Sequence, residues 1–190
     1  MIRGQRRWLL GGGIGSGKSV VRALLERSGV RTVDADSVGH AVLEPGAEAY
    51  EVVAEQWPRV VREGRIDRGL LAEIVFDDTA ELRRLEAITH PYIFGRIQRL
   101  VEGFDTSVVV EIPLLRPAFA SDWGQIVVDS DDETRLERAV ARGLDREDAV
   151  ARMKAQPTRQ AWLSAADLVI PNHRSLRDLE ETVAQVVELL

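Results

Sequence analysis

The chemistry of this sequence is concentrated in a glycine-rich segment near its amino terminus. The segment follows the pattern G-x-x-x-x-G-K-[ST], and its residues are Gly12, Gly13, Ile14, Gly15, Ser16, Gly17, Lys18 and Ser19. Between a strand and a helix, such a P-loop predicts a cradle of backbone N–H groups for the phosphates of ATP. Lys18 would reach the β- and γ-phosphates, and the Ser19 hydroxyl would help to hold Mg²⁺. The alternative, a plain glycine-rich turn with an exposed Lys18, leaves the Lys18-Ser19 pair at this offset unexplained.

A pair of carboxylates, Asp34-Ala35-Asp36, follows the second predicted strand. A carboxylate at the end of such a strand can accept a proton from an attacking hydroxyl or hold Mg²⁺. If strand geometry continues through Asp36, the two side chains point the same way. The alternative is structural, because Asp36 is equally well placed to cap a helix that begins at Ser37. Spacing alone does not choose between the two.

Several arginines surround Gly143 in a predicted helix-break-helix segment, and they are Arg138, Arg142, Arg146 and Arg152. Arginines that close over a nucleotide stabilise charge on a transferring phosphoryl group and expel water. The alternative is a solvated charged face, because the acidic residues Glu137, Asp145, Glu147 and Asp148 are interleaved with them.

Two further motifs have an ordinary structural explanation. His90-Pro91 predicts a surface histidine where a long helix is kinked or interrupted. Gly64-Arg65 and Asp67-Arg68 predict a turn with capped ends.

The elements that must position these residues alternate along the chain. Short apolar runs predict strands at residues 8–10, 30–33, 108–112, 126–128 and 167–170. Helical patterns lie between them, over residues 37–43, 47–57 and 145–156 and in a long charged region that ends at Gly103. This alternation predicts right-handed βαβ units and a parallel sheet, whose ligands bind at the carboxyl ends of the strands. The P-loop, the Asp34–Asp36 pair and Asp129 all fall at such ends.

The composition of the 190-residue chain, with 45% hydrophobic residues and a net charge of −6, indicates a globular protein without a large nucleic-acid surface. No apolar run approaches the roughly 20 residues of a membrane helix. The chain has no cysteine, and its three histidines show no metal-ligand spacing, which excludes disulfides, Cys-ligated zinc and thiol catalysis. We expect a cytoplasmic protein, monomeric or weakly homo-oligomeric, without nucleic-acid or membrane partners.

Taken together, the motifs resemble those of the dephospho-coenzyme A kinase family, in order and over most of the chain. The P-loop with its Gly-Gly-Ile start resembles that of the family, as do Val33-Asp34-Ala35-Asp36 and Ile112-Pro113-Leu114-Leu115. The other similar segments are Glu44-Pro45-Gly46, residues 64–68 with Leu71-Ala72 and Val75-Phe76, residues 85–91, Arg138, Arg142 and Arg146 with Gln156, and residues 166–170 with Asn172. The P-loop is shared with many families, whereas the other motifs are jointly specific.

The resemblance implies transfer of a phosphoryl group from ATP, with Mg²⁺, to the 3′-hydroxyl of the ribose of dephospho-coenzyme A, the last step of coenzyme A synthesis. It also implies an α/β P-loop kinase fold, a five-stranded parallel sheet flanked by helices. In that fold the core spans about residues 1–36 and 105–190, a helical acceptor-binding insert about 37–104, and a lid about 138–157.

The resemblance also assigns roles to single residues. Asp36 is the candidate base, and Lys18, Arg142 and Arg146 stabilise the moving phosphoryl group. The expected ATP-binding residues are Gly13, Ile14, Gly15, Ser16, Gly17, Lys18, Ser19, Val20 and Asn172, with Asn172 beside the adenine and Ser19 also serving the metal. The expected acceptor-binding residues are Asp36, Arg68 and His90.

The sequence departs from the family pattern at a few places, namely Gly11, Val20, Trp57-Pro58, Arg116 and His173. Val20 leaves the metal-side hydroxyl of Ser19 in place, whereas Arg116 reverses the charge expected beside the site. Two alternatives therefore stay open: a P-loop kinase for another small-molecule hydroxyl, and a nucleotide-binding module without catalysis.

Overall fold

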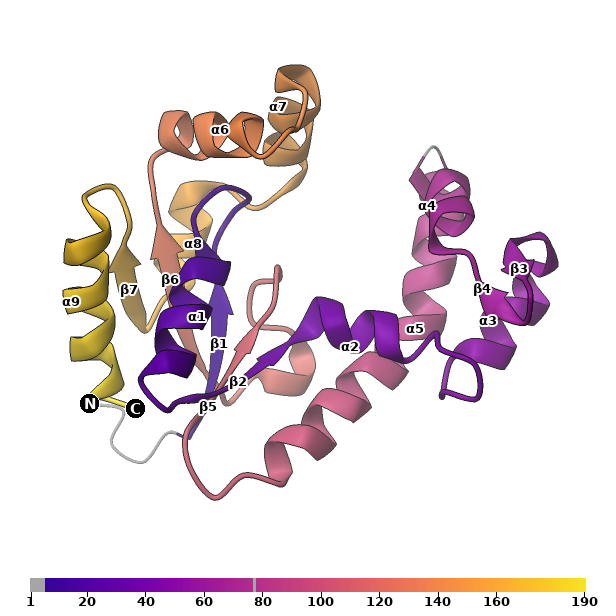
Figure 1. Cartoon of the computed structure of the whole chain (residues 1–190), viewed down its shortest axis with the longest axis horizontal. Coiled ribbons are helices and arrows are strands. Elements are labelled where there is room, and N and C mark those ends of the chain that lie inside the picture. Colours follow the sequence, from indigo (N-terminus) through magenta and orange to yellow (C-terminus); the bar gives the residue numbers. More distant parts are fainter. Residues whose placement is uncertain (1–5, 77) are drawn as a thin grey trace. The chain divides into compact units, whose positions relative to one another are not determined.

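The computed structural model describes residues 6–76 and 78–190 (Figure 1). Residues 1–5 of the predicted core lie outside the described residues. The strands are β1 (Arg7–Gly11), β2 (Arg31–Asp34), β3 (Val61–Arg62), β4 (Arg65–Ile66), β5 (Val108–Glu111), β6 (Gly124–Asp129) and β7 (Leu168–Pro171). The helices are α1 (Lys18–Arg27), α2 (Ala35–Ala41), α3 (Tyr50–Gln56), α4 (Arg68–Phe76), α5 (Thr79–Glu102), α6 (Asp132–Ala141), α7 (Arg146–Ala155), α8 (Arg159–Ala165) and α9 (Leu176–Val187), with short 3₁₀ turns η1 (Pro58–Val60) and η2 (Ala118–Ala120).

The centre of the fold is a five-stranded sheet with the strand order β2-β5-β1-β6-β7. β1 pairs in parallel with β5 and β6, with Leu9 opposite Val110 on one side and Gln125 on the other. β6 pairs in parallel with β7. The predicted parallel sheet is therefore confirmed, and the apolar runs of β1 and β6 are continuous because both faces of these strands are covered.

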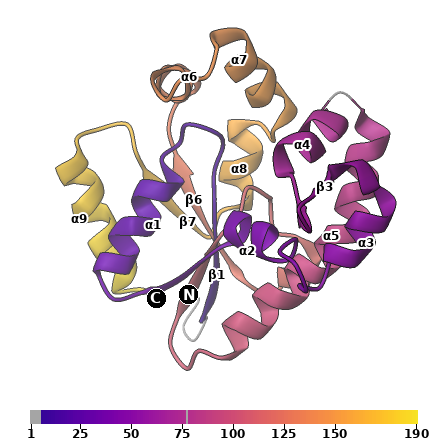
Figure 2. The same cartoon turned by 45° about the vertical axis from the view of Figure 1, so that its right-hand side comes forward.

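The apolar core holds the sheet against its helices. One cluster joins Trp8 and Leu10 of β1 with Leu25 of α1 and Val183 of α9, all at most 1% exposed. α1 and α9 lie side by side over this face of the sheet (Figure 2). Burial of each such side chain stabilises the fold by about 1.5–3 kcal/mol, so the core fixes the sheet edge from which the site is built.

The chain forms two compact units, one up to Val33 together with Phe104–Leu190, and the other Asp34–Gly103. The first contains the five-stranded sheet, except for Asp34 at the end of β2, together with α1 and α6 to α9. The second contains α2 to α5 and the β3–β4 hairpin, and its own buried residues include Val42, Val53 and Ile97.

The long helix of the second unit differs from the sequence prediction. α5 is a continuous helix over Thr79–Glu102 with Pro91 inside it, so of the two expected outcomes, an interruption or a kink, the interruption is wrong. Pro91 removes one donor from the helix, and its partner would have been the carbonyl of Ala87. Both residues are exposed, which allows water to satisfy that carbonyl, and the helix ends at Gly103 as predicted.

The β3–β4 hairpin and α8 are short elements that the sequence did not predict as such. The predicted turn at Gly64 is the tip of the β3–β4 hairpin, with positive φ at Glu63 and Gly64. Asp67 caps α4 by accepting from the backbone N–H groups of Gly69 (3.0 Å) and Leu70 (3.1 Å). α8 was not predicted at all, because only one of its side chains, Trp162, is fully buried.

Candidate active site

The glycine-rich loop leaves the carboxyl end of β1 and leads into α1. Gly12, Gly15 and Gly17 have φ values of 142°, 76° and 99°, which favour glycine. Gly17 is the N-cap of α1 and supplies no side chain to the helix end, and no acidic residue lies in the first turn. The N–H groups of that turn therefore keep their affinity for an anion, as at other helix amino termini that bind phosphate.

Lys18 folds back over the loop. Its Nζ donates to the carbonyl oxygen of Gly12 at 2.8 Å and lies 3.4 Å from that of Gly13. The side chain is half-buried, so it is not the exposed lysine of a plain glycine turn. Its charge is held at the loop by two backbone carbonyls, which a phosphate oxygen could replace.

A carboxylate that the sequence analysis did not single out lies beside Ser19. The Ser19 hydroxyl donates to Oε1 of Glu111 at 3.3 Å, and Arg22 donates to Oε2 at 2.7 Å. Glu111 ends β5, the strand next to β1, and its position at a strand end was the signal that could have found it. The pair brings a hydroxyl and a carboxylate together at the first turn of α1.

Asn172 lies under the loop. Its side-chain Nδ2 donates to the carbonyl oxygen of Ser16 at 2.8 Å, and a Cβ added to Gly17 would lie only 2.2 Å from that nitrogen. Ser130 donates its hydroxyl to the Asn172 carbonyl at 2.6 Å and accepts from Arg138 at 3.0 Å. Asn172 was expected beside the adenine; here its buried amide supports the P-loop backbone.

Ile14, at the tip of the loop, is held by side chains from two distant segments. Its N–H donates to Oε1 of Gln156 at 2.7 Å, and its carbonyl accepts from Nε of Arg135 at 3.0 Å. Arg135 is 4% exposed and was not among the arginines singled out from the sequence. No local pattern marks it, because the contact joins residues 121 positions apart.

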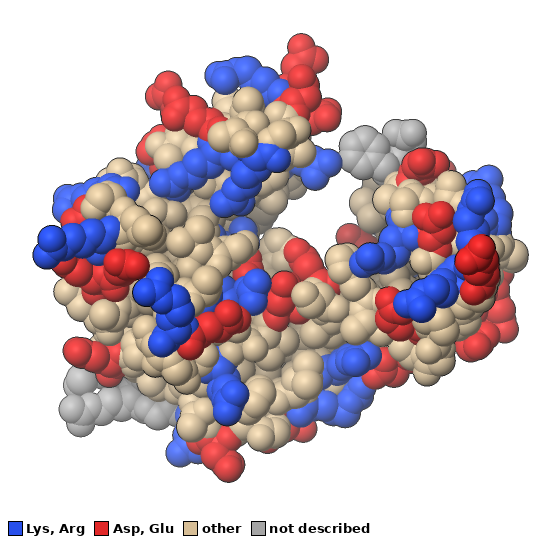
Figure 3. All heavy atoms as spheres, in the orientation of Figure 1, with Lys and Arg blue, Asp and Glu red and all other residues tan. Residues whose placement is uncertain are grey.

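The arginines predicted for the lid lie on the α6–α7 segment. Arg142 is the C-cap of α6, Gly143 follows with a φ of 95°, and Arg146 begins α7. Both arginines are exposed, and within the described residues neither forms an ion pair with the interleaved acids. In Figure 3, Lys and Arg atoms form a band along the lower edge of this segment, the edge nearer the P-loop.

The base of the α6–α7 segment is fixed by an ion pair. Arg159, at the start of α8, donates from Nε and Nη2 to the two carboxylate oxygens of Asp129, each at 2.7 Å. These hydrogen bonds raise the pKa of Arg159 above its ordinary value. Next to this pair, the Thr134 N–H lowers the pKa of Asp131, the N-cap of α6, by donating to its carboxylate.

The two aspartates of the Asp34-Ala35-Asp36 motif have different surroundings. Asp34 is the N-cap of α2 and accepts from the N–H groups of Asp36 (3.0 Å) and Ser37 (3.4 Å). Asp36 lies in the first turn of α2, so the strand geometry that was the condition for both side chains to point the same way does not extend to it. Asp34 takes the capping role, and the exposed Asp36 carboxylate has no partner among the described residues.

Arg68 and His90 both belong to the second unit. Arg68 is the first residue of α4 and is exposed. His90 is half-buried on α5, and its ring stacks against Phe94 with 5.0 Å between centroids.

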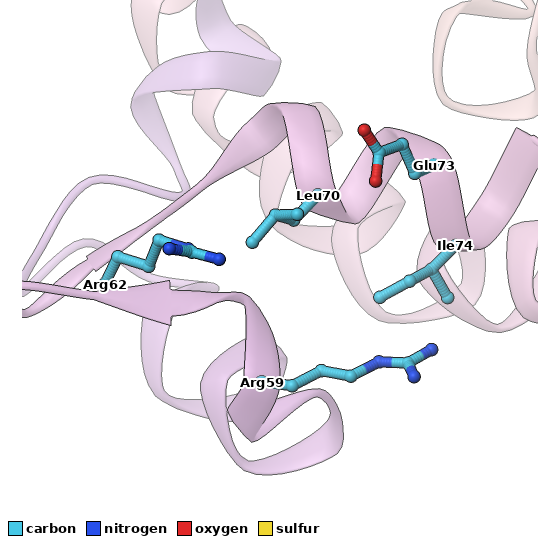
Figure 4. Close-up of a pocket in the computed structure, with 5 residues that line it drawn as sticks. All are labelled: Arg59, Arg62, Leu70, Glu73 and Ile74. Carbon is cyan, nitrogen blue, oxygen red and sulfur yellow. The ribbon is translucent and has the colours of Figure 1, made fainter.

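The second unit also contains a pocket of about 470 Å³ that the sequence analysis did not foresee. Figure 4 shows Arg62 of β3 pointing toward Leu70 and Arg59 of η1 extending beneath Ile74. Glu73 completes the lining from α4. The pocket combines two guanidinium groups with apolar side chains.

Two of the departures from the family pattern, Gly11 and Arg116, have local structural explanations. At Gly11, an added Cβ would lie 2.5 Å from the buried ring of Trp162 and 2.6 Å from the Gln125 amide, so a larger residue has no room. Arg116 pairs with Asp167, which neutralises the charge that it brings. Val20 and His173 are exposed.

Comparison with known proteins gives a consistent result. A family model described as Dephospho-CoA kinase matches residues 9–178. A protein of Thermobifida fusca named Dephospho-CoA kinase is 43% identical over 190 residues, covering 95% of this chain and 94% of the relative.

Solved structures agree with the sequence comparison. The TT1252 protein of Thermus thermophilus superposes with a TM-score of 0.83 at 34% identity, covering 98% of each chain. A structure titled Dephospho-CoA kinase from Campylobacter jejuni gives a TM-score of 0.73 at 26% identity, covering 96% of each chain.

Among the described helices, none has the length and apolar character needed to cross a bilayer.

Proposed function

The chain belongs to the dephospho-CoA kinase family, and we propose that it transfers the γ-phosphoryl group of ATP to the 3′-hydroxyl of dephospho-CoA, in the cytoplasm. The observation that supports this most strongly is the conformation of the P-loop. Three glycines with positive φ place Lys18 and Ser19 at the uncapped amino terminus of α1. The five-stranded parallel sheet that carries this loop is that of a P-loop kinase.

On the donor side, the backbone N–H groups of residues 13–20 would bind the phosphates of ATP. Lys18 exchanges its carbonyl partners for the β- and γ-phosphates, and its charge compensates the charge that develops on the transferred group. Asn172 supports the loop through Ser16, which is compatible with a place near the nucleotide but adds a role in shaping the cradle.

A magnesium ion fits the residues beside the loop. Within residues 6–76 and 78–190, no cluster of three or more acidic or histidine side chains is arranged to hold a metal. Mg²⁺ bound with ATP needs only one or two protein oxygens, because phosphates and waters complete its octahedron. The Ser19 hydroxyl and the Glu111 carboxylate, 3.3 Å apart, would hold it, and the bound ion would neutralise phosphate charge.

On the acceptor side, the proposal assigns residues 34–103 to dephospho-CoA. Asp36 would accept the proton of the 3′-hydroxyl as that oxygen attacks the γ-phosphorus, and its carboxylate is free for this because Asp34 caps α2. Arg68 would pair with a phosphate of the acceptor, and His90 would line its site.

The lid, residues 138–157, supplies Arg142 and Arg146. Their guanidinium groups are exposed and unpaired within the described residues, so both are free to reach phosphate oxygens when the segment closes. Closure over ATP would expel water, which strengthens each electrostatic contact and prevents hydrolysis.

The test is incubation of the purified chain with Mg-ATP and dephospho-CoA, followed by mass spectrometry for coenzyme A. The proposal predicts one added phosphoryl group on the acceptor and its loss in Lys18→Ala. Adenosine and shikimate, offered separately, serve as competing hydroxyl acceptors. Faster turnover of either, or ATP binding without transfer to any acceptor, would contradict the proposal.

A further inference from the structure

The two peptide groups that meet at Ile14 are both fixed by side chains from outside the loop. The N–H of Ile14 belongs to the peptide that it shares with Gly13, and Gln156 accepts from it at 2.7 Å. The carbonyl of Ile14 belongs to the peptide that it shares with Gly15, and Arg135 donates to it at 3.0 Å. Both contacts are partly buried, so solvent competes with them only weakly.

This arrangement answers a problem created by the glycines. Gly13 and Gly15 flank Ile14, and glycine permits backbone rotations that other residues resist. The Gly13–Ile14 plane is also held inside the loop, because the Gly13 carbonyl accepts from the Ser16 N–H at 3.1 Å, whereas the Ile14–Gly15 plane is held by Arg135. Because the Ile14 N–H is bonded to Gln156, it is the Gly15 N–H that a rotation of the Ile14–Gly15 plane would turn away from the phosphates, while it aimed the Ile14 carbonyl at them.

Arg135 is built closely into the loop. A Cβ added to Gly13 would lie 1.9 Å from Nη2 of Arg135, and one added to Gly15 would lie 2.1 Å from the Arg135 carbonyl oxygen. Nη1 pairs with Asp132 at 2.8 Å, whereas Nη2 is buried with no hydrogen-bond partner among the described residues. A buried guanidinium packed this closely against two glycines leaves the backbone around Ile14 little room to move.

Arg135 and Gln156 lie near the two ends of the lid. Arg135 precedes residues 138–157 on α6, and Gln156 stands at the C-cap of α7, one residue before the lid ends. Below them, the Asp129–Arg159 pair anchors the strand that enters the segment to the helix that leaves it. Because Arg135 and Gln156 both bond to Ile14, a movement of the α6–α7 segment relative to this ion pair would act on the carbonyl and on the N–H of Ile14.

We propose that Arg135 and Gln156 are positioning residues that hold the Ile14 peptides in the orientation required for ATP phosphates and couple the lid to the P-loop. The inference rests on the proposed function for its ligand, ATP, but not for the acceptor. Neither residue needs to touch substrate in this scheme. Their effect is expressed in affinity for the triphosphate, because that affinity depends on the orientation of the loop amides.

The first test is Gln156→Ala, with Gln160→Ala as the matched control. Gln160 undergoes the same chemical change, is exposed on α8, and among residues 6–76 and 78–190 its side chain bonds only to Ser164 of its own helix. Calorimetry with a non-hydrolysable ATP analogue should give a Kd about fivefold higher for Gln156→Ala and unchanged for Gln160→Ala, as expected for the loss of one hydrogen bond. Competition by inorganic tripolyphosphate against the analogue, measured by the same calorimetry without an acceptor, should weaken by the same factor, because the effect acts on phosphate recognition.

A second readout examines the contact itself. Amide exchange at Ile14 should accelerate in Gln156→Ala and return toward the parent rate in Gln156→Glu, whose carboxylate retains an acceptor. Arg135→Lys, which keeps the charge and one donor, should raise the Kd less than Arg135→Met, for which we expect about tenfold or more. A loss of fold alone would lower the active fraction and kcat without moving the Kd.

The inference is overturned if Gln156→Ala binds the ATP analogue as tightly as Gln160→Ala does, or if Ile14 exchange is the same in both. It is also overturned if only nucleotides, and not tripolyphosphate, bind more weakly. Because these measurements use no acceptor, a failure to phosphorylate dephospho-CoA would contradict the proposed function and leave this inference standing.

Discussion

The two units of the chain differ in how their candidate site residues are held. Around the P-loop, backbone groups of Ile14 and Ser16 are bonded to side chains 121 to 156 residues away in the sequence. In the unit of residues 34–103, Asp36 and Arg68 are exposed and have no partner among the described residues. In the proposed function, the phosphate-binding loop is therefore shaped before a ligand binds, whereas the exposed Asp36 and Arg68 are left for the acceptor to order.

The difference has a physical reason. A triphosphate presents the same charged groups in every reaction of this kind, so a rigid cradle lowers the entropy cost of binding it. An acceptor with a long flexible arm must instead be gathered from many conformations, and exposed side chains can adapt to it. Substitutions that disturb the P-loop should accordingly affect both stability and ATP affinity, whereas substitution of the exposed Asp36 or Arg68 should affect turnover or KM for the acceptor and leave stability unchanged.

The largest effect is expected from the base. Asp36→Asn should lower kcat by about 10²–10⁴-fold while leaving ATP affinity and thermal stability near those of the parent. Asp34→Ala is the matched control, because it removes the cap of α2 and should cost about 1 kcal/mol of unfolding free energy. Steady-state kinetics and thermal unfolding separate the two outcomes. A kcat for Asp36→Asn close to that of the parent would remove the proton-acceptor role.

Lys18→Ala should come next. Removal of the charge held over the loop is expected to reduce kcat by about 10²–10³-fold and to weaken ATP binding as well, because Lys18 serves both the ground state and the transition state. Calorimetry together with single-turnover kinetics would measure both. ATP binding at parental strength would contradict the assignment of the cradle.

The support of the loop predicts a contrast between two glycines that share a positive φ. Gly15 (φ 76°) and Gly29 (φ 86°) have similar backbone conformations, but only at Gly15 would a Cβ meet another residue, Arg135. Gly29→Ala should therefore cost about 1 kcal/mol, the usual penalty of that conformation. Gly15→Ala should cost about 1–3 kcal/mol more, since the crowding is added to it. Denaturant unfolding measures the loss of unfolding free energy in both variants. Equal losses would show that Arg135 does not pack tightly against the loop.

The smallest effect is expected at Arg68. Arg68→Ala should raise KM for dephospho-CoA by roughly threefold to tenfold, the loss expected for one charge-assisted contact, and should leave KM for ATP unchanged. The unfolding free energy should stay within about 0.5 kcal/mol of the parent because the side chain is exposed. A change in KM for ATP instead would place Arg68 on the donor side.

The parts of this molecule that sequence could predict are those set by local patterns. The apolar runs of β1, β5 and β6 identified the sheet because strands covered on both faces carry no polar alternation. The P-loop was recognisable because its glycines and Lys18-Ser19 must keep a fixed spacing around a phosphate. Both signals lie within about ten residues of chain.

The contacts that hold the site depended on tertiary structure and could not be predicted. Glu111 meets Ser19 only because β5 lies beside β1, a strand order that no local pattern states. Arg135 and Gln156 resemble other polar residues of charged helices until α6 and α7 are placed on the loop. The choice between Asp34 and Asp36 as the cap of α2 turned on where β2 ends, and strand ends are poorly marked in sequence.

Hydrogen exchange with each ligand alone tests the division between the two units most directly. A non-hydrolysable ATP analogue should slow exchange in residues 12–19 and 138–157, and dephospho-CoA without nucleotide should slow exchange within residues 34–103. Protection of residues 12–19 by dephospho-CoA alone, or no protection of residues 34–103, would contradict the account of a preformed phosphate site and an acceptor unit ordered by its ligand.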